Sequence, residues 1–411
     1  NHLSRDNLMH KRLLIVFVLG FSSGLPLALI SSTLQAWFAD SGMSIFATGM
    51  LSLISLPYLY RIIWAPILDR YTLLRIGKRR SWILVMQICL LIGFNLMAWL
   101  TPTQTPLFIA FLAAAMATCS ATQDLAIDAH RTEFLSTEEL GLGASLATLG
   151  YRLALLVAGG VALIIAQYAG WSVAYRVMGF LMVAGMIAVY FSPEPSKPIV
   201  KKLSFYESFL EPFRELISRP RIVPLLFFIF FYKMGEAFTT TTSGIMMPFL
   251  IQDIGFSLET IAYVNKIIGI GSIVLGGLLA GFLLMRWSLY RALLVFGLLQ
   301  AVTNALFILL AKVGNHLPTF IFAVISDNFT AGMASTALVV LFMRLVDLRF
   351  TAAQFSIFVA FSTLPRVLSG PLGALFQSWF GWVGLYQIAF VLALVFIPFL
   401  MLFREQMATS Q

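Results

Sequence analysis

The sequence predicts an all-α membrane protein in which twelve transmembrane helices form two pseudo-symmetric bundles of six. Of its 411 residues, 60% are hydrophobic and only 11% are charged, and the mean hydropathy is +0.91. This is more apolar surface than a water-soluble domain can bury. The apolar residues fall into stretches of about 20 residues, the length needed to cross a hydrocarbon core of ~30 Å. The longest polar connection divides these stretches six and six.

In chain order the predicted spans are 13–38, 46–68, 82–101, 106–128, 142–166, 171–191, 222–250, 258–284, 291–311, 317–343, 353–378 and 383–403. Residues 1–12 and 404–411 are the predicted tails, 13–191 and 222–403 the two bundles, and 192–221 the linker between them. Within that linker, "FYESFLEPFRELI" has helical apolar spacing with acids between, which predicts an amphipathic helix on the membrane surface.

The charges of the connections predict the orientation of the chain. Cations gather in alternate connections, for example Lys78 to Arg80 and Lys197 to Lys202, whereas the opposite loops contain Lys312 alone. By the positive-inside rule both termini are cytoplasmic. The net charge of +9 therefore reflects orientation, and cations confined to short juxtamembrane loops exclude a nucleic-acid-binding surface.

Ionisable side chains within predicted spans are costly, at about 2.5–3.5 kcal/mol on insertion scales, and they usually face a cavity or a partner. The acids of this kind are Asp124, Asp128, Glu236 and Asp327, of which Asp128 is near the cytoplasmic end of its span. Each is a candidate for proton coupling, because burial favours a neutral carboxyl while a nearby cation favours a charged one. A structural role stays open for each, since Asp124 could anchor neighbouring helices and Glu236 could form an ion pair with Lys233, three residues away.

Uncharged polar residues in the spans could bind sugar hydroxyl and N-acetyl groups. They are Gln35 with Trp37, the threonine run 239–242, Asn265, Asn304 and Asn328, and the tyrosines Tyr58, Tyr151 and Tyr263 offer stacking surfaces.

The two halves also repeat. At an offset of 205, Tyr58 matches Tyr263 and Arg61 matches Lys266. Arg152 similarly matches Arg366 at an offset of 214, and Asp124 has a counterpart in Asp327. Two parallel repeats with substrate at their interface are typical of transporters. This architecture resembles that of the major facilitator superfamily.

In that superfamily the loop between spans two and three contains an acid, a glycine and cations that hold one conformation. The resemblance implies a cytoplasmic latch in "DRYTLLRIGKRRSW" (69–82), made by Asp69, Arg70, Gly77, Lys78, Arg79 and Arg80. The alternative is that these charges only set the orientation.

Arg61 lies well inside an apolar span and needs a counter-charge. One interpretation is a positive cavity formed by Arg61 and Lys266, with Arg152 and Arg366, whose missing counter-charge is the carboxylates of a substrate. An arginine fork suits carboxylates because it binds them through two hydrogen bonds. The alternative is a local acid partner, for which Asp69, eight residues away, is a candidate.

Longer sequence strings indicate a resemblance to one family within that superfamily. They are "GFSSGLPLALISSTLQAW" (20–37), "DRYT" with "GKRRSW", "CSATQDLAIDAHRTEFL" (119–135), "LGYRLALLVAGGVAL" (149–163), "YKMGEAF" (232–238) and "SLYRALLVFGLLQAVTNALF" (288–307). Together they resemble the AmpG-type muropeptide permeases over roughly 13–403. The resemblance implies proton-motive-force-driven import of GlcNAc-1,6-anhydro-MurNAc and its peptide-bearing forms across a Gram-negative inner membrane. Cell-wall recycling, and in some members β-lactamase induction, depends on this import.

Other functions stay open at this point. The same fold could transport another organic anion, such as an acetyl-CoA-like or siderophore-type solute, or act as a transport-inactive membrane sensor. We expect no enzyme, metal or cofactor, because the two cysteines (Cys89 and Cys119) and four histidines form no ligand pattern and no nucleotide-binding loop is present. The expected coupling ion is the proton, the expected partners are the anionic substrate and the bilayer, and the expected state is a monomer.

Overall fold

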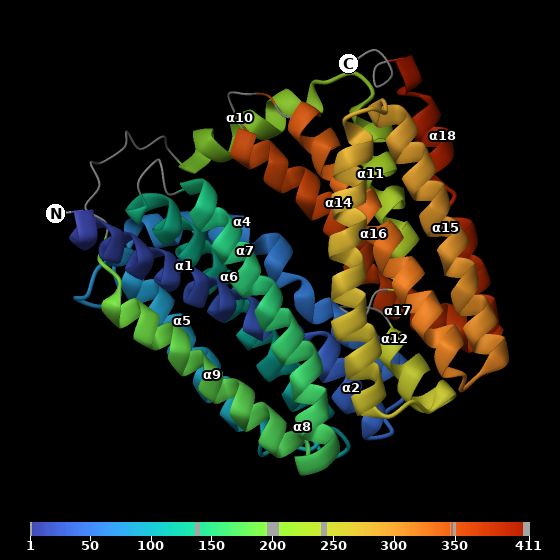
Figure 1. Cartoon of the computed structure of the whole chain (residues 1–411), viewed down its shortest axis with the longest axis horizontal. Coiled ribbons are helices and arrows are strands. Elements are labelled where there is room, and N and C mark those ends of the chain that lie inside the picture. The colour runs from blue at the N-terminus through green and yellow to red at the C-terminus, as the bar shows by residue number, and fades with distance from the viewer. Residues whose placement is uncertain are drawn as a thin grey trace. The chain divides into compact units, whose positions relative to one another are not determined.

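The computed structural model describes residues 2–135, 140–194, 205–239, 245–345, 347 and 351–405, and within these ranges the chain is helical with no strand (Figure 1). Nine helical stretches in the described ranges are long and apolar enough to cross a membrane. The prediction of an all-helical multi-pass membrane protein is therefore confirmed.

The nine stretches account for more than nine of the predicted spans. Ser356–Met401 has 46 residues and includes Gly381, whose φ of 72° interrupts the helix between the predicted spans 353–378 and 383–403. The predicted span 46–68 is divided into α3 (Ile45–Met50), a 3₁₀ segment η1 (Leu51–Ser55) and α4 (Pro57–Arg70). In the predicted span 222–250, residues 240–244 lie outside the described ranges. The count of twelve thus stays a prediction.

The helices form two compact units. Unit 1 consists of Asn1–Met43, Ile54–Lys201 and Ser257–Ala262, and unit 2 of Ser44–Leu53, Lys202–Phe256 and Tyr263–Gln411. Two short segments are thus exchanged relative to the predicted bundles: 44–53 groups with the second unit and 257–262 with the first.

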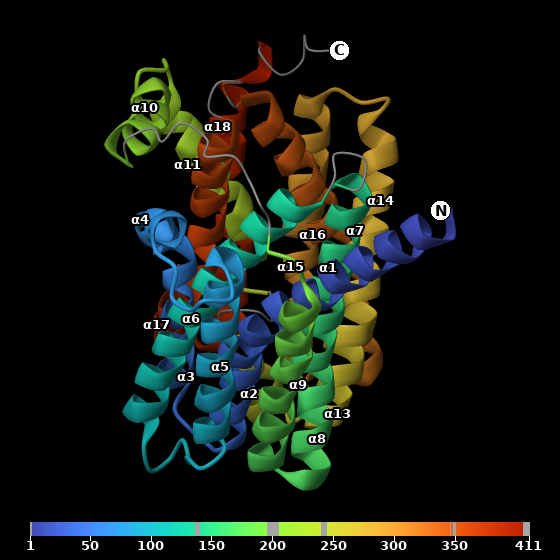
Figure 2. The ribbon, with the colours of Figure 1, turned by 90° about the vertical axis from the view of Figure 1, so that its left-hand side faces the viewer.

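Unit 1 is built around a close pairing of its first and fifth predicted spans. Its helices are α1 (His2–Ile30), α2 (Ser32–Asp40), α4, α5 (Lys78–Met97), α6 (Pro106–Phe134), α7 (Leu140–Leu156), the π-helix η2 (Val157–Val161), α8 (Ala162–Ala169), α9 (Trp171–Phe191) and α13 (Leu258–Ile261). A Cβ at Gly20 or Gly150 would collide with the backbone of the facing helix, so α1 and α7 meet through small residues. Helix α5 packs against α6 and α9 (Figure 2).

Unit 2 repeats this arrangement with the later spans. Its helices are α3, α10 (Phe205–Ile217), α11 (Ile222–Ala237), α12 (Met246–Pro248), the π-helices η3 (Phe249–Ile254) and η4 (Ala262–Ile268), α14 (Gly269–Leu284), α15 (Leu289–Val313), α16 (Leu317–Leu345), α17 (Thr351–Leu392) and α18 (Phe396–Met401). Helix α16 packs against α14 and α15, and α17 packs against α11. The short helix α3 also packs on α17, where Gly49 and Gly370 allow the two backbones to approach closely.

The predicted amphipathic helix of the linker is present as α10. Leu216 on it is buried, whereas Phe213 and Ile217 are 39% and 63% exposed. Figure 1 shows α10 in light green at the end of unit 2 where α17 begins, and Gln354 near the start of α17 contacts it.

Candidate functional site

The polar centre of unit 1 is an aspartate held by two other helices. Asp124 of α6 is 8% exposed, and its Oδ1 accepts a hydrogen bond from Ser23 Oγ of α1 at 2.5 Å. Its Oδ2 lies 3.8 Å from Arg61 Nη1 of α4. The expectation that Arg61 lacks a counter-charge within the protein is therefore wrong. The partner seen in the described structure is an acid 63 positions along the chain, which no local spacing could indicate, and the side chain of the other candidate, Asp69, lies outside the described residues.

Hydrogen bonds around Asp124 fix the helices that present it. Tyr58, one turn before Arg61 on α4, donates its hydroxyl to Ser120 Oγ at 2.6 Å. Trp64, one turn after Arg61, donates its indole N–H to Thr122 Oγ1 at 3.0 Å. These bonds hold α4 against α6, so the arginine and the aspartate face each other.

Other predicted residues of unit 1 have varied surroundings. Arg152 is exposed, and Tyr151 beside it is half-buried with its backbone against Gly24. Gln35 on α2 is fully buried, and neither atom of its amide group has a hydrogen-bond partner among the described residues. Trp37 is 4% exposed and packs on Tyr175 at a ring distance of 5.0 Å, which leaves little of its ring available for stacking on a sugar.

The polar centre of unit 2 is also an aspartate, but its surroundings differ. Asp327 of α16 is 4% exposed, and its Oδ1 accepts hydrogen bonds from Thr239 at 3.1 Å and Thr303 at 3.4 Å. No Lys or Arg of the described ranges forms an ion pair with it. Asn304 on α15, beside Thr303, donates to the carbonyl of Gly235 at 2.8 Å, and its own Oδ1 is buried without a partner there.

The π-helix η4 carries three predicted residues. Lys266 and Asn265 are 5% and 7% exposed, and Asn265 Nδ2 has no partner among the described residues. Tyr263 is 48% exposed, unlike its repeat-mate Tyr58, which is hydrogen-bonded to Ser120. Asn328 is half-buried and bonds to its own helix at Val324, and Thr240 to Thr242 lie outside the described residues.

The ion pair that the three-residue spacing predicts is present in unit 2. Lys233 Nζ lies 2.7 Å from Glu236 Oε1 and also donates to Ser335 Oγ at 2.9 Å. Both side chains line a cavity of about 100 Å³ together with Arg366 of α17. Asp128, in contrast, is exposed and pairs with Arg131 at 3.1 Å near the end of α6.

The predicted latch has partners that the sequence did not indicate. Arg79, 6% exposed, donates to Glu133 at 3.0 Å and to the carbonyl of Leu68 at 3.3 Å. Glu194 accepts from the backbone N–H groups of Arg79 and Arg80 at 3.3 and 3.4 Å, and Gly77 is the residue before α5 with φ of 122°. Lys78 is half-buried, and the side chains of Asp69 and Arg70 lie outside the described structure. The anchors of this loop are therefore the ends of α4, α6 and α9.

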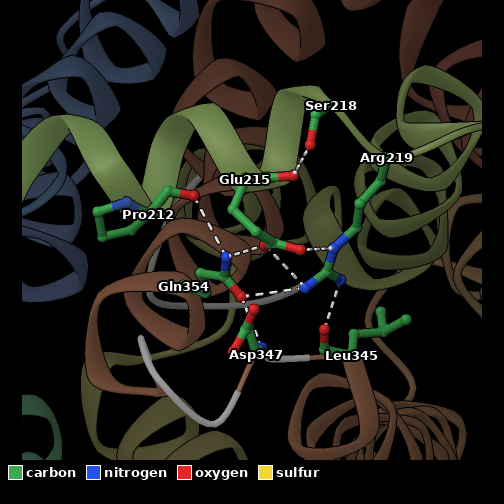
Figure 3. A network of polar contacts seen from close by, with 7 residues as sticks. All are labelled: Pro212, Glu215, Ser218, Arg219, Leu345, Asp347 and Gln354. Carbon is green, nitrogen blue, oxygen red and sulfur yellow. Dashed lines mark hydrogen bonds and ion pairs between the residues drawn. The ribbon is translucent and has the colours of Figure 1, made fainter.

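A second polar network ties the linker to unit 2, and Figure 3 shows it. Glu215 of α10 accepts two hydrogen bonds from Arg219, at 2.9 and 3.0 Å, and a third from the fully buried Gln354. Arg219 also donates to the carbonyl of Leu345 at the end of α16. The hydrogen bonds from Arg219 lower the pKa of Glu215.

Comparison with known proteins identifies the family. The family model of the Major Facilitator Superfamily matches residues 13–364. The chain is 38% identical over 392 residues to the anhydromuropeptide permease of Escherichia coli K12, covering 95% of this chain and 79% of that protein. It is also 34% identical to an uncharacterized protein of Haemophilus influenzae, covering 97% and 95% of the two chains.

Solved structures agree on the fold. The nucleoside transporter NupG superposes with a TM-score of 0.74 at 13% identity, covering 95% of this chain and 99% of that chain. A bacterial homologue of the lysosomal transporter Spinster has a TM-score of 0.75 at 15% identity, covering 97% of each chain. With the helical fold, the sequence match and these superpositions together, the chain belongs to the Major Facilitator Superfamily and, within it, to the AmpG-type permeases.

Proposed function

We propose that this protein imports anhydromuropeptides across a bacterial inner membrane by alternating access, driven by the proton-motive force. The observation that carries the proposal is the 38% identity over 95% of the chain to a permease named for that substrate. The proposed substrates are GlcNAc-1,6-anhydro-MurNAc and its peptide-bearing forms, taken up for cell-wall recycling. In the proposed orientation both termini are cytoplasmic, as the distribution of cations predicts.

The polar groups of each unit suit a sugar that carries carboxylates. Unit 1 supplies Arg61 and Arg152 with the buried amide of Gln35, and unit 2 supplies Arg366 and Lys266 with the buried amide of Asn265. A buried amide without a partner costs free energy that a substrate hydroxyl or N-acetyl group can recover. Arg61 is shared, because Asp124 already lies 3.8 Å from it. We infer that a substrate carboxylate competes with Asp124 for this guanidinium.

Among the four candidate acids, Asp327 is the proposed proton carrier. Asp124, Glu236 and Asp128 each have a cationic partner, at 3.8, 2.7 and 3.1 Å respectively. Asp327 has hydroxyl groups as its hydrogen-bond partners, so within the described part of the chain an ionised Asp327 would be a buried charge without a cation. Burying such a charge is expensive, and a bound proton removes the cost. Proton binding and release at Asp327 would therefore couple strongly to any change in its access to water.

The energetics set a condition on coupling. A membrane potential of roughly 100 mV is worth about 2.3 kcal/mol per charge, which corresponds to about 50-fold accumulation for one net positive charge. An anionic substrate entering an inside-negative cell is opposed by the same potential. Net uptake driven by the potential alone therefore requires more protons than the substrate has negative charges, and the transport is then electrogenic.

The test is uptake into proteoliposomes that contain the purified full chain. Radiolabelled GlcNAc-1,6-anhydro-MurNAc, with and without peptide, should accumulate under an imposed proton gradient, and unlabelled muropeptides should compete while unrelated sugars, peptides and organic anions should not. A protonophore should abolish accumulation. Uptake that persists after both the potential and the pH gradient have collapsed would exclude proton coupling. Stronger competition by another organic anion would show that this anion, and not a muropeptide, is the substrate.

A further inference from the structure

A small polar cavity lies within unit 2, between α11 and α17. Its lining residues are Lys233, Glu236 and Ala237 of α11 and Ser362, Thr363 and Arg366 of α17. Its volume of about 100 Å³ is well below the roughly 300–1,000 Å³ of a pocket that encloses a whole small-molecule ligand. The cavity can therefore hold one chemical group of a larger substrate, not a complete sugar pair.

The charges of the cavity do not balance. Lys233 and Glu236 neutralise each other at 2.7 Å, and both side chains are only partly buried, at 21% and 23% exposed. Arg366 is half-buried, and no acid of the described residues forms an ion pair with its guanidinium. The cavity thus retains one uncompensated positive charge, and the guanidinium offers a planar fork that matches a carboxylate.

The remaining polar groups of the cavity are acceptors. Ser362 and Thr363 both donate their hydroxyl protons to the carbonyl of Val359, at 2.7 and 2.8 Å, so their oxygens have lone pairs but no proton to offer a ligand. Glu236 receives the ammonium of Lys233 on Oε1, which leaves Oε2 as a further acceptor. These acceptor oxygens, one of them on a carboxylate, suit a positively charged hydrogen-bond donor such as an ammonium group.

We propose that this cavity binds an α-amino-acid head group of the substrate, with the carboxylate on Arg366 and the ammonium on Glu236 and the hydroxyl oxygens of Ser362 and Thr363. The proposal rests on the proposed function, because it assigns the cavity to the peptide of an anhydromuropeptide. In such a molecule the first amino group of the peptide is in an amide bond to the sugar. A free ammonium beside a carboxylate is therefore present only where the peptide contains a diamino acid with an unsubstituted head group. The cavity would select for that residue.

The wild-type protein provides the first test, with four ligands in proteoliposomes. They are the disaccharide alone, the disaccharide with a peptide ending in a free diamino-acid head group, the same compound with that ammonium acetylated, and the same compound with the head-group carboxylate amidated. Hydrogen bonds to charged groups contribute about 1.5–3 kcal/mol. We expect the free head group to compete for uptake at concentrations about tenfold or more below those of either derivative.

Two variants then assign the two ends of the head group. Arg366→Gln should remove the preference for the free over the amidated carboxylate, and Glu236→Gln should remove the preference for the free over the acetylated ammonium. Each preference is the ratio of two affinities measured in the same variant, so a uniform change in affinity for all ligands leaves it unaffected. Arg286→Gln, an exposed arginine of the same unit outside the cavity, is the matched control and should keep both preferences.

The outcomes separate this proposal from the proposed function. If the wild type transports all four ligands equally well, the cavity is no head-group site while the function stands. If preference depends on the carboxylate but not on the ammonium, the site binds an anion only and the assignment of Glu236 is wrong. An equal loss of affinity for all ligands, with a lowered melting temperature in both variants, would show that the two residues have a structural role. If no muropeptide is transported by the wild type, it is the proposed function that fails.

Discussion

Asp124 in unit 1 and Asp327 in unit 2 lie on matching helices, α6 and α16, and each accepts a hydrogen bond from a hydroxyl group, that of Ser23 on α1 or of Thr239 just after α11. Among the described residues, Asp124 has an arginine at ion-pair distance, 3.8 Å away, and Asp327 has none. The repeat has therefore kept the position of an acid but not its charge environment. This difference allows the two acids to have separate roles, one in an exchangeable ion pair and one in proton transfer.

The largest expected effect comes from removing Asp327, the acid that forms no ion pair within the described ranges. In the wild type, a potential of roughly 100 mV supports about 50-fold accumulation for each net positive charge that enters. Asp327→Asn should reduce this accumulation to equal concentrations on the two sides of the membrane. Exchange of labelled for unlabelled substrate should continue, because the binding groups remain. The comparison with Asp124→Asn is decisive: if that variant loses accumulation while Asp327→Asn retains it, the roles of the two acids are reversed. Normal accumulation in both would place proton coupling elsewhere.

Removing the arginine of the unit 1 pair should affect binding and stability together. Arg61→Lys should keep the charge near Asp124 but weaken binding of peptide-bearing substrates about tenfold relative to the disaccharide, since Lys cannot form the two-bond fork. Arg61→Ala should do so more severely and also lower the melting temperature, because Asp124 is left as a buried acid without its cation.

The double variant Arg61→Ala with Asp124→Asn separates these two effects. It should recover thermal stability relative to Arg61→Ala alone but not the binding of peptide-bearing substrates. Equal weakening for peptide-bearing substrates and for the disaccharide would instead give Arg61 a purely structural role.

Two buried or partly buried arginines, Arg79 in unit 1 and Arg219 in unit 2, offer a second comparison, with a smaller expected effect. Arg79 is almost fully buried and bonds to Glu133 and to the carbonyl of Leu68, whereas Arg219 is 22% exposed at its side chain. Arg79→Gln should destabilise the protein by about 1.5–3 kcal/mol, as expected for lost charged hydrogen bonds. Arg219→Gln should cost less. Melting temperatures in one detergent would rank the two, and a larger loss for Arg219→Gln would contradict the comparison.

The smallest expected effect is a dependence on pH at the linker helix. The hydrogen bonds from Arg219 lower the pKa of Glu215 below its ordinary value of 4.5 in the folded protein. Glu215 therefore contributes stability above its unfolded pKa, and this contribution is lost as the pH falls through the folded value. The difference in melting temperature between wild type and Glu215→Gln should be constant from pH 7 to about 5 and should shrink below pH 5. The contribution of Glu215 to the free energy of unfolding should be under about 1 kcal/mol. A difference that grows on acidification would contradict this assignment.

Local patterns in the sequence were the reliable part of the prediction. Runs of about 20 apolar residues predict spans because membrane thickness sets their length, and the three-residue spacing of Lys233 and Glu236 predicts a contact because one helix carries both. The linker helix was visible for the same reason, in its apolar period.

Contacts between distant helices were not predictable in this way. The partner of Arg61 is on another helix, and Ser23 and Thr303 have no feature in the sequence that marks them as partners of an acid. In the sequence, Glu133 and Glu194 look like any other charges between predicted spans, yet Glu133 accepts from the Arg79 guanidinium and Glu194 from its backbone N–H. Such contacts depend on which helix faces meet, and a single sequence carries no direct record of that.

The division of two predicted spans between the units has a consequence for how the chain can be assembled. Residues 44–53 precede the linker but group with α17, and residues 257–262 follow the linker but pack with α8, where Tyr168 donates to Glu259. A half-protein cut within the linker would lack one segment of its own unit and carry one segment that belongs to the other. The two halves should therefore fold poorly when made alone and recover when made together, so that the protein matures as a single obligate whole rather than as two independent modules.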